Sequence, residues 1–209
     1  MDQEALWSAR YRAAGADFLF GIEPNHFLSR RAHLFALGHT ALSVADGEGR
    51  NSVWLAEQGL KVTAVEISPV AVAKARKFAA GRNVAVEFQL ADLLAANWPP
   101  AELENRYDWV VGIFIQFIGA EDRPRQLAAL KRATRPGGRI LLLGYTPKQL
   151  EYKTGGPSTL ENLYTADILR LEFVDWTIEE LTEYEDDISE GAGHRGRSAL
   201  IGLVARKPR

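Results

Sequence analysis

Short apolar runs alternate with segments of helical pattern from residue 40 to residue 144. The runs are rich in Val, Ile and Leu on both faces, and they cover residues 40–45, 62–65, 84–88, 109–118 and 140–143. This pattern is typical of parallel strands that are buried between helices. We therefore expect five parallel strands in this part of the chain.

Three segments between these runs have the pattern of helices: 50–58, 68–80 and 124–134. The second has Ser68 at the N-cap and Pro69 at the first helical position, with Gly81 just past its end. The third is followed by the turn sequence Arg-Pro-Gly-Gly at 135–138. This alternation predicts an α/β fold with a Rossmann-like sheet and helices on both faces.

The alternation changes beyond residue 144. A loop containing 154–157 precedes a predicted helix near 160–171, and two strand-like runs, 173–184 and 198–205, flank the glycine-rich segment 191–196. Two strands with no helix between them pair antiparallel. We predict a single domain over 1–209, with a seven-stranded, mostly parallel sheet that ends in an antiparallel hairpin. Residues 1–39 form a helical extension or lid in this interpretation.

Composition narrows the possible chemistry. The 209 residues contain no cysteine, which excludes disulfides, cysteine nucleophiles and zinc–thiolate sites, and the four histidines lack metal-ligand spacing. We expect no metal. The formal net charge is −2, and 179–190 carries seven acidic and no basic residues, which is typical of a solvated edge strand and argues against a nucleic-acid partner. The N-terminus lacks signal-peptide features and no apolar run approaches ~18 residues, so we expect a cytoplasmic protein without a membrane partner.

Polar groups suited to a ligand follow the first three predicted strands. The stretch 45–51, Ala-Asp-Gly-Glu-Gly-Arg-Asn, joins strand to helix, and its glycines let a ligand approach the backbone. Alone, this turn is equally well explained as a tight connection. Glu66, however, ends the second strand 19 residues beyond Gly47, where a carboxylate accepts hydrogen bonds from both ribose hydroxyls. Asp92 follows the third strand, where it would accept a hydrogen bond from the amine of adenine. Together these groups predict a nucleoside cofactor.

With these residues the chain resembles the class I S-adenosylmethionine-dependent methyltransferases. Segments 42–59, 62–69 and 87–93 are similar to the first three motifs of that family, 107–117 to its fourth strand and 135–138 to the turn before its fifth. The final hairpin resembles the antiparallel strands six and seven of the family, and the match covers about 40–206. Residues 20–25 and the Gly-Arg-Asn at 49–51 resemble a small bacterial branch related to tellurite-resistance and thiopurine methyltransferases.

The resemblance implies S-adenosylmethionine as the cofactor. The residues it assigns to cofactor binding are Ala45, Asp46, Gly47, Gly49, Asn51, Glu66, Ile67, Ser68, Asp92 and Leu93. The chain departs from the family pattern at one place, because Ser43 and Ala45 stand where an acidic residue and the first of three glycines are usual. Asp46 or a water molecule would then take the place of the missing carboxylate.

Candidates for the acceptor end come from four segments. Trp7 and Phe20, together with Tyr11 and Phe18, form an aromatic lid or simply pack on the domain. Phe114 and Gln116 follow the fourth strand, and Tyr145 and Tyr152 belong to the loop after the fifth. His194 in the hairpin loop is a base or a group that orients the acceptor, unless it is an exposed loop histidine. Tyr11 and His194 are the candidate catalytic residues.

The expected function is methyl transfer from S-adenosylmethionine to a small-molecule acceptor, with thiol, selenium or tellurium nucleophiles as the soft acceptors that need least assistance. A module that binds the cofactor without transferring methyl groups is the alternative. A nicotinamide-dependent dehydrogenase fits the glycine turn, but the closing hairpin is not the second nucleotide-binding half that such a fold requires. The oligomeric state is left open.

Overall fold

The computed structural model describes residues 2–191 and 193–209 and contains a seven-stranded sheet of order β3-β2-β1-β4-β5-β7-β6. Strands β1 to β5 pair in parallel, and β7 pairs antiparallel with both β5 and β6. The strands are β1 Thr40–Val44, β2 Lys61–Glu66, β3 Val86–Leu90, β4 Tyr107–Ile113, β5 Thr134–Tyr145, β6 Thr177–Glu190 and β7 His194–Arg206. The predicted fold class is confirmed.

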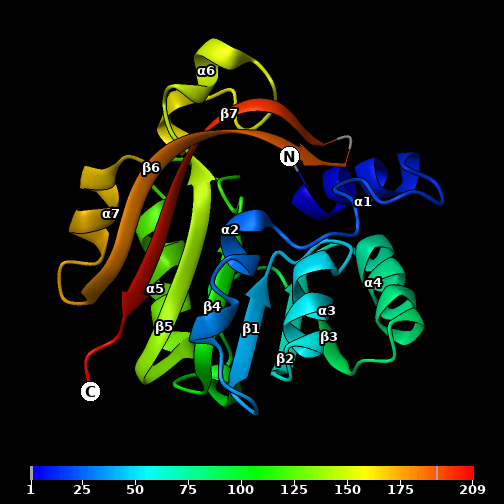
Figure 1. Ribbon diagram of the computed structural model, residues 1–209, viewed down its shortest axis with the longest axis horizontal. Coiled ribbons are helices and arrows are strands. Elements are labelled where there is room, and N and C mark those ends of the chain that lie inside the picture. Colours follow the sequence, from blue (N-terminus) through cyan, green and yellow to red (C-terminus); the bar gives the residue numbers. More distant parts are fainter. Residues whose placement is uncertain (1, 192) are drawn as a thin grey trace.

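Helices cover both faces of the sheet (Figure 1). Helices α2 (His26–Ser29) and α3 (Arg50–Glu57) pack on one face, and α5 (Arg123–Ala133) and α7 (Ala166–Glu172) pack on the other. The remaining helical elements are α1 Gln3–Ala13, α4 Pro69–Gly81, α6 Gln149–Tyr152 and the 3₁₀ turns Ala32–Leu34, Ala101–Leu103 and Leu160–Asn162. None of the helices that the structure describes is long and apolar enough to span a membrane.

The inner strand β5 shows how the sequence pattern produces two hydrophobic cores. Successive side chains of a strand point to opposite faces of the sheet. Accordingly, Ile140 and Leu142 belong to the cluster under α5 and α7, whereas Leu141 and Leu143 belong to the cluster under α2 and α3. Because both faces are buried, the sequence of this strand is a continuous apolar run.

The predicted strand 109–118 is wrong in its second half, because β4 ends at Ile113. Phe114 has φ of +57°, a left-handed conformation that cannot continue a strand, and its N–H donates to the carbonyl of Leu143 at 2.8 Å. The chain turns there, and the side chains that follow lie at the carboxyl edge of the sheet.

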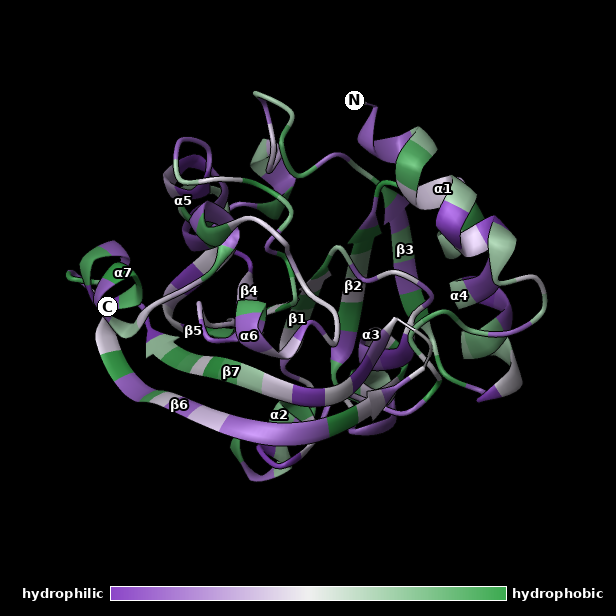
Figure 2. Ribbon diagram, turned by 90° about the horizontal axis from the view of Figure 1, so that it is seen from above, coloured by the Kyte–Doolittle hydropathy of each residue, from purple (hydrophilic) through white to green (hydrophobic). Residues whose placement is uncertain are grey.

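The predicted elements between 160 and 184 also shift. Helix α7 begins only at Ala166, where Thr165 caps it by accepting the N–H of Ile168 at 3.2 Å. Phe173 belongs to the core beside Trp176 and not to a strand, and β6 begins at Thr177. The acidic segment lies along β6, which is an edge strand as expected and is largely hydrophilic in Figure 2.

The terminal hairpin is longer than predicted. Strand β6 continues to Glu190 and β7 starts at His194, so most of the expected loop between 184 and 198 is paired strand. The two curved strands carry the hairpin tip across to the N-terminal segment (Figure 1), where the N–H of Gly193 donates to the carbonyl of Leu19 at 3.0 Å. This contact joins the N-terminal segment to the terminal hairpin, and both segments lie beside one cavity.

Candidate active site

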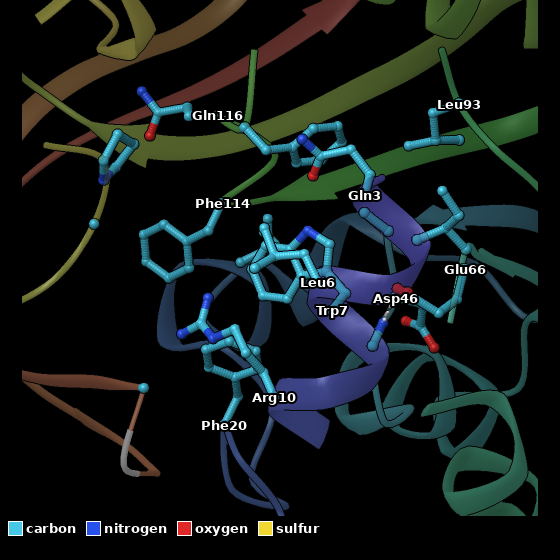
Figure 3. Close-up of a pocket in the computed structure, with 18 of the residues that line it drawn as sticks. Gln3, Leu6, Trp7, Arg10, Phe20, Asp46, Glu66, Leu93, Phe114 and Gln116 are labelled. Carbon is cyan, nitrogen blue, oxygen red and sulfur yellow. Dashed lines mark hydrogen bonds between the residues drawn. The ribbon is translucent and has the colours of Figure 1, made fainter. Parts of the chain in front are cut away.

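A cavity of about 490 Å³ lies at the carboxyl edge of the parallel strands. Its wall is built by α1, the turn after β1, the ends of β2 to β5, the loop 156–162 and the start of β7. Among the predicted site residues it is lined by Trp7, Tyr11, Phe20, Ala45, Asp46, Gly47, Asn51, Glu66, Ile67, Asp92, Leu93, Phe114, Gln116, Tyr145 and His194. Figure 3 shows Asp46 and Glu66 on one side of the cavity and Phe20 and Phe114 on the other.

The glycine turn after β1 is required by close packing. Gly47 has φ of +64°, and a Cβ there would lie 2.8 Å from the hydroxyl of Tyr11. Gly49 has φ of +93° at the start of α3, and a Cβ there would lie 2.9 Å from the Cβ of Ala75. Gly49 does not line the cavity, but it lets α4 pack against this turn. The turn therefore exposes backbone to the cavity where a side chain would fill the space.

Glu66 reaches the cavity from the end of β2. Its two carboxylate oxygens accept the N–H of Gly47 and the N–H of Ser68, each at 2.9 Å, and the residue is only 5% exposed. Burial raises the pKa of this carboxyl, although the two backbone donors oppose the shift. Each oxygen keeps a further acceptor position, so the carboxylate can accept two hydroxyl donors of a ligand.

Asp46 lines the cavity, but its oxygens are already hydrogen-bonded. One accepts the hydroxyl of Ser43 at 2.6 Å, and the other accepts the hydroxyl of Ser52 at the start of α3. Burial raises the pKa of this carboxyl as well. Ser43 stands where the family that the chain resembles usually has an acidic residue. Its hydrogen bond to Asp46 ties the end of β1 to the turn.

The end of the third strand supplies a further part of the cavity wall. Asp92 and Leu93 line the cavity, and one carboxylate oxygen of Asp92 accepts the N–H of Leu94 at 2.8 Å. Ser68 does not line the cavity: its hydroxyl caps α4 at Ala71 and pairs with the hydroxyl of Ser8 at 2.8 Å. Ser68 therefore fastens α1 over the site.

Helix α1 forms the roof of the cavity. It is capped by Asp2, and it places Trp7 and Tyr11 on the cavity, with their ring centroids 6.0 Å apart. Tyr11, a candidate catalytic residue, has its hydroxyl over Gly47 and its ring 6.2 Å from that of Phe20. Phe18 packs against Phe78 at 5.2 Å and does not line the cavity.

His194 lies in an aromatic environment at the other end of the cavity. Its ring centroid is 4.6 Å from that of Phe20 and 4.4 Å from that of Phe114, and its Nδ1 is hydrogen-bonded to the hydroxyl of Tyr145 at 2.7 Å. Gln116 aligns this end: its amide accepts the N–H of Tyr145 at 2.6 Å and donates to the carbonyl of Tyr145 at 2.9 Å. These contacts hold the imidazole in one orientation.

Tyr152 is not a pocket residue, contrary to the prediction. It lies on α6, and its hydroxyl donates to Glu185 on the outer strand β6, where Lys148 and Arg197 also pair with this carboxylate. The loop after β5 reaches the cavity instead with the segment 156–159 and Asn162.

The environment of His194 does not support its predicted role as a base. Burial, together with the positive charges of Arg50 and Arg10, lowers its pKa to about 3. The imidazole is therefore neutral at physiological pH. It can donate or accept a hydrogen bond, but it does not become protonated and act as a general base.

We expect wild-type protein to lose more stability between pH 7 and pH 5 than the variant His194→Gln. The folded state keeps the imidazole neutral because its pKa is about 3, whereas the unfolded chain protonates it around the ordinary ~6.5. The free energy of unfolding therefore falls as the pH drops below about 6.5, because the unfolded chain gains a proton that the folded protein does not. The loss from this one group reaches up to about 2 kcal/mol at pH 5. Urea unfolding at both pH values measures the difference, and equal pH dependence in the two proteins would contradict a buried neutral His194.

Several lining residues were not predicted from the sequence, among them Gln3, Leu6, Arg10 and Arg50. The first three lie on the cavity-facing side of α1, whose position no local pattern indicates. Arg50 belongs to the turn sequence 45–51 and to the Gly-Arg-Asn of the resemblance, but no ligand role was predicted for it. Its place next to the glycine turn was a signal that a charged group stands beside the ligand.

Residues 41–138 match a family model described as the methyltransferase domain. This match spans 98 of the 209 residues, and together with a curated methyltransferase relative it supports methyl transfer as the activity and S-adenosylmethionine as the cofactor.

Two curated proteins illustrate the range of relatives. Over 218 aligned residues, spanning all of this chain and 69% of the other, the chain is 26% identical to Hemagglutinin 1 of Eikenella corrodens. It is 32% identical over 108 residues to the demethylmenaquinone methyltransferase of Thermus thermophilus, which is 51% of this chain and 47% of that enzyme.

Solved structures share the architecture. A structure concerned with the conversion of a disulfide bond into a thioacetal group during echinomycin biosynthesis has a TM-score of 0.79 at 22% identity, covering 98% of this chain and 91% of that one. TehB from Haemophilus influenzae has a TM-score of 0.69 at 22% identity, covering 88% of this chain and 62% of TehB. At these identities the likeness establishes the fold.

Proposed function

We propose that this methyltransferase acts on a small acceptor that presents a soft nucleophile, such as a thiolate or a selenium or tellurium anion. The observation that carries the proposal is the acceptor end of the cavity, where aromatic rings surround one neutral imidazole. A cavity of about 490 Å³ that also holds the cofactor leaves room for a small molecule only. The reaction at sulfur named for the echinomycin structure supports a sulfur acceptor, and we place the chain near the tellurite-resistance and thiopurine branch on segments 20–25 and 49–51.

The residues present fit the nucleoside part of the cofactor. Glu66 has acceptor positions for both ribose hydroxyls, Asp92 faces the adenine side, and the glycine turn leaves space beneath Tyr11. When bound, S-adenosylmethionine supplies a methyl group that its sulfonium has already activated, so orientation and exclusion of water provide most of the acceleration. Trp7, Tyr11 and Phe20 exclude water in this proposal, and their ring faces attract the positive sulfonium.

His194 orients the acceptor in this proposal. Because Tyr145 occupies Nδ1, Nε2 is the nitrogen left to meet a ligand. A group whose pKa is about 3 is too weak a base to hold a thiol proton at neutral pH. The acceptor must therefore arrive ionised, which favours soft anions over amines and alcohols.

We expect His194→Gln to lower methyl transfer by roughly tenfold or more while the dissociation constant of S-adenosylhomocysteine stays within about twofold. Glutamine keeps a hydrogen-bonding amide but loses the ring that packs between Phe20 and Phe114. Tyr152→Phe, which alters a hydroxyl outside the cavity, is the control. Isothermal titration measures the dissociation constant, and transfer assays measure the rate of methyl transfer. A loss of cofactor affinity would indicate that His194 contacts the cofactor and not the acceptor.

Transfer of labelled methyl groups from S-adenosylmethionine to a panel of acceptors tests the function. The panel contains small thiols, selenide, tellurite with a reductant, amines and alcohols. Transfer to thiols or metalloids, but not to amines or alcohols, is the expected result. Saturable cofactor binding with no transfer to any acceptor would instead establish a binding module.

A further inference from the structure

Arg10 is a cation on the wall of the cavity. It lies in the last turn of α1, and its guanidinium carbon is 4.6 Å from the ring centroid of Trp7. The face of an aromatic ring attracts a guanidinium and orients it, while the N–H groups in the guanidinium plane stay available to a ligand. Among residues 2–191 and 193–209, no carboxylate forms an ion pair with Arg10 and no acceptor takes a hydrogen bond from its side chain.

The contacts of Trp7 place Arg10 toward the end of the cavity that holds His194. The ring centroid of Trp7 is 6.4 Å from that of Phe20, which is itself 4.6 Å from that of His194. Burial and two positive charges, one of them on Arg10, lower the pKa of the imidazole, so the charge of Arg10 is felt at this end. Figure 3 shows Arg10 on the side of Phe20 and away from Glu66.

The acidic groups of the cavity lie on the other half of the sheet. The carboxylates that line the cavity are at or just after the ends of β1, β2 and β3: Asp46, Glu66 and Asp92. The second lining cation, Arg50, is paired with the buried carboxylate of Glu190 at 2.6 Å. Among the described residues, Arg10 is therefore the lining cation whose charge no carboxylate balances.

We propose that Arg10 selects a negatively charged acceptor and holds its anionic group near His194. The inference rests on the proposed methyltransferase function, in which the acceptor arrives ionised because the imidazole is too weak a base. A fixed cation favours the ionised form of a bound acceptor and draws anions into the cavity. The anionic group is either the reacting thiolate itself or a second acidic group, such as a carboxylate, on the same molecule.

Arg12 provides a matched control for Arg10. Both residues are exposed and lie in the last turn of α1, but Arg12 does not line the cavity. Arg10→Gln and Arg12→Gln remove the same charge from the same end of the helix, so the difference between them reports on the cavity. Arg10→Lys keeps the charge and is expected to keep most of the activity. Thermal unfolding establishes that each variant is folded, and calorimetry measures its affinity for S-adenosylhomocysteine.

Methyl transfer to 3-mercaptopropionate and to uncharged 3-mercaptopropanol is measured at low and at high ionic strength. We expect Arg10→Gln to lower kcat/KM by roughly fivefold or more at low ionic strength, and salt to reduce this loss because ions screen an exposed charge. A loss with both thiols means that Arg10 acts on the thiolate. A loss with 3-mercaptopropionate alone means that Arg10 binds the second acidic group. Equal transfer by Arg10→Gln and Arg12→Gln, or weaker binding of S-adenosylhomocysteine by Arg10→Gln alone, would overturn the proposal.

Failure of the wild-type protein to methylate any acceptor would refute the proposed function. The inference is then decided by the binding of 3-mercaptopropionate to protein loaded with S-adenosylhomocysteine. Tighter binding by Arg12→Gln than by Arg10→Gln supports it, and equal binding overturns it.

Discussion

Substitution of Glu66 by glutamine is expected to weaken the binding of S-adenosylhomocysteine by roughly tenfold to a hundredfold. A hydrogen bond to a charged group contributes about 1.5–3 kcal/mol, and glutamine exchanges the carboxylate for one acceptor and one donor group. The amide also has to face the N–H groups of Gly47 and Ser68, which now share one acceptor oxygen. Isothermal titration calorimetry measures the change.

Glu87→Gln is the matched control for this experiment. Glu87 lies one strand away on β3 in register with Thr63, and it is exposed and outside the cavity. We expect its affinity to equal that of wild type. Unchanged affinity in a folded Glu66→Gln protein would show that the ribose is held elsewhere, and Glu66→Ala then distinguishes a weak contact from none.

A reversible staple between α1 and α4 is expected to slow cofactor release at least tenfold. The hydroxyls of Ser8 and Ser68 lie 2.8 Å apart, so Ser8→Cys/Ser68→Cys places two thiols within reach of a disulfide. The chain has no cysteine of its own, so no other intramolecular disulfide competes. If α1 must lift for the ligand to leave, the oxidised protein traps the ligand that it bound while reduced.

Stopped-flow displacement of a fluorescent cofactor analogue measures this release rate. The reduced double variant controls for the altered N-cap at Ser68, and reduction of the trapped complex should restore rapid exchange. Equal release rates in the oxidised and reduced protein would mean that α1 is a fixed wall and that the ligand leaves by another route, such as past the loop 156–159.

The sheet was predictable because its signal is local. Strands buried on both faces produce continuous apolar runs such as 140–143, and Ser68 with Pro69 defines the start of α4 within two residues. The end of β4 was not predictable, because the residues after Ile113 are as apolar as a strand and only the left-handed Phe114 interrupts them. The pattern of hydrophobic residues indicates which residues are buried. It does not indicate where a buried segment turns.

The carboxylates at the strand ends line the cavity because the parallel topology determines their positions. The contacts at the opposite end of the cavity were not predictable, although several of the residues were named, because these contacts join residues far apart in the chain: Tyr145 with His194, and Arg50 with Glu190. Each of these side chains has an ordinary alternative role on a surface. Only the curvature of the terminal hairpin, which no residue pattern encodes plainly, brings them to one cavity.

The position of β7 has a consequence for how the enzyme is made. This strand is later in the sequence than every other strand, yet it lies inside the sheet between β5 and β6. During synthesis β5 and β6 are both made before β7, the strand that pairs with each of them. The edge of β5 and the whole of β6 therefore stay unpaired until β7 leaves the ribosome. His194 arrives with β7, and the tip that precedes it bonds to Leu19. A growing chain therefore has Glu66 at the end of β2 long before β7 closes the cavity, so the proposed methyl transfer has to wait until the hairpin is complete.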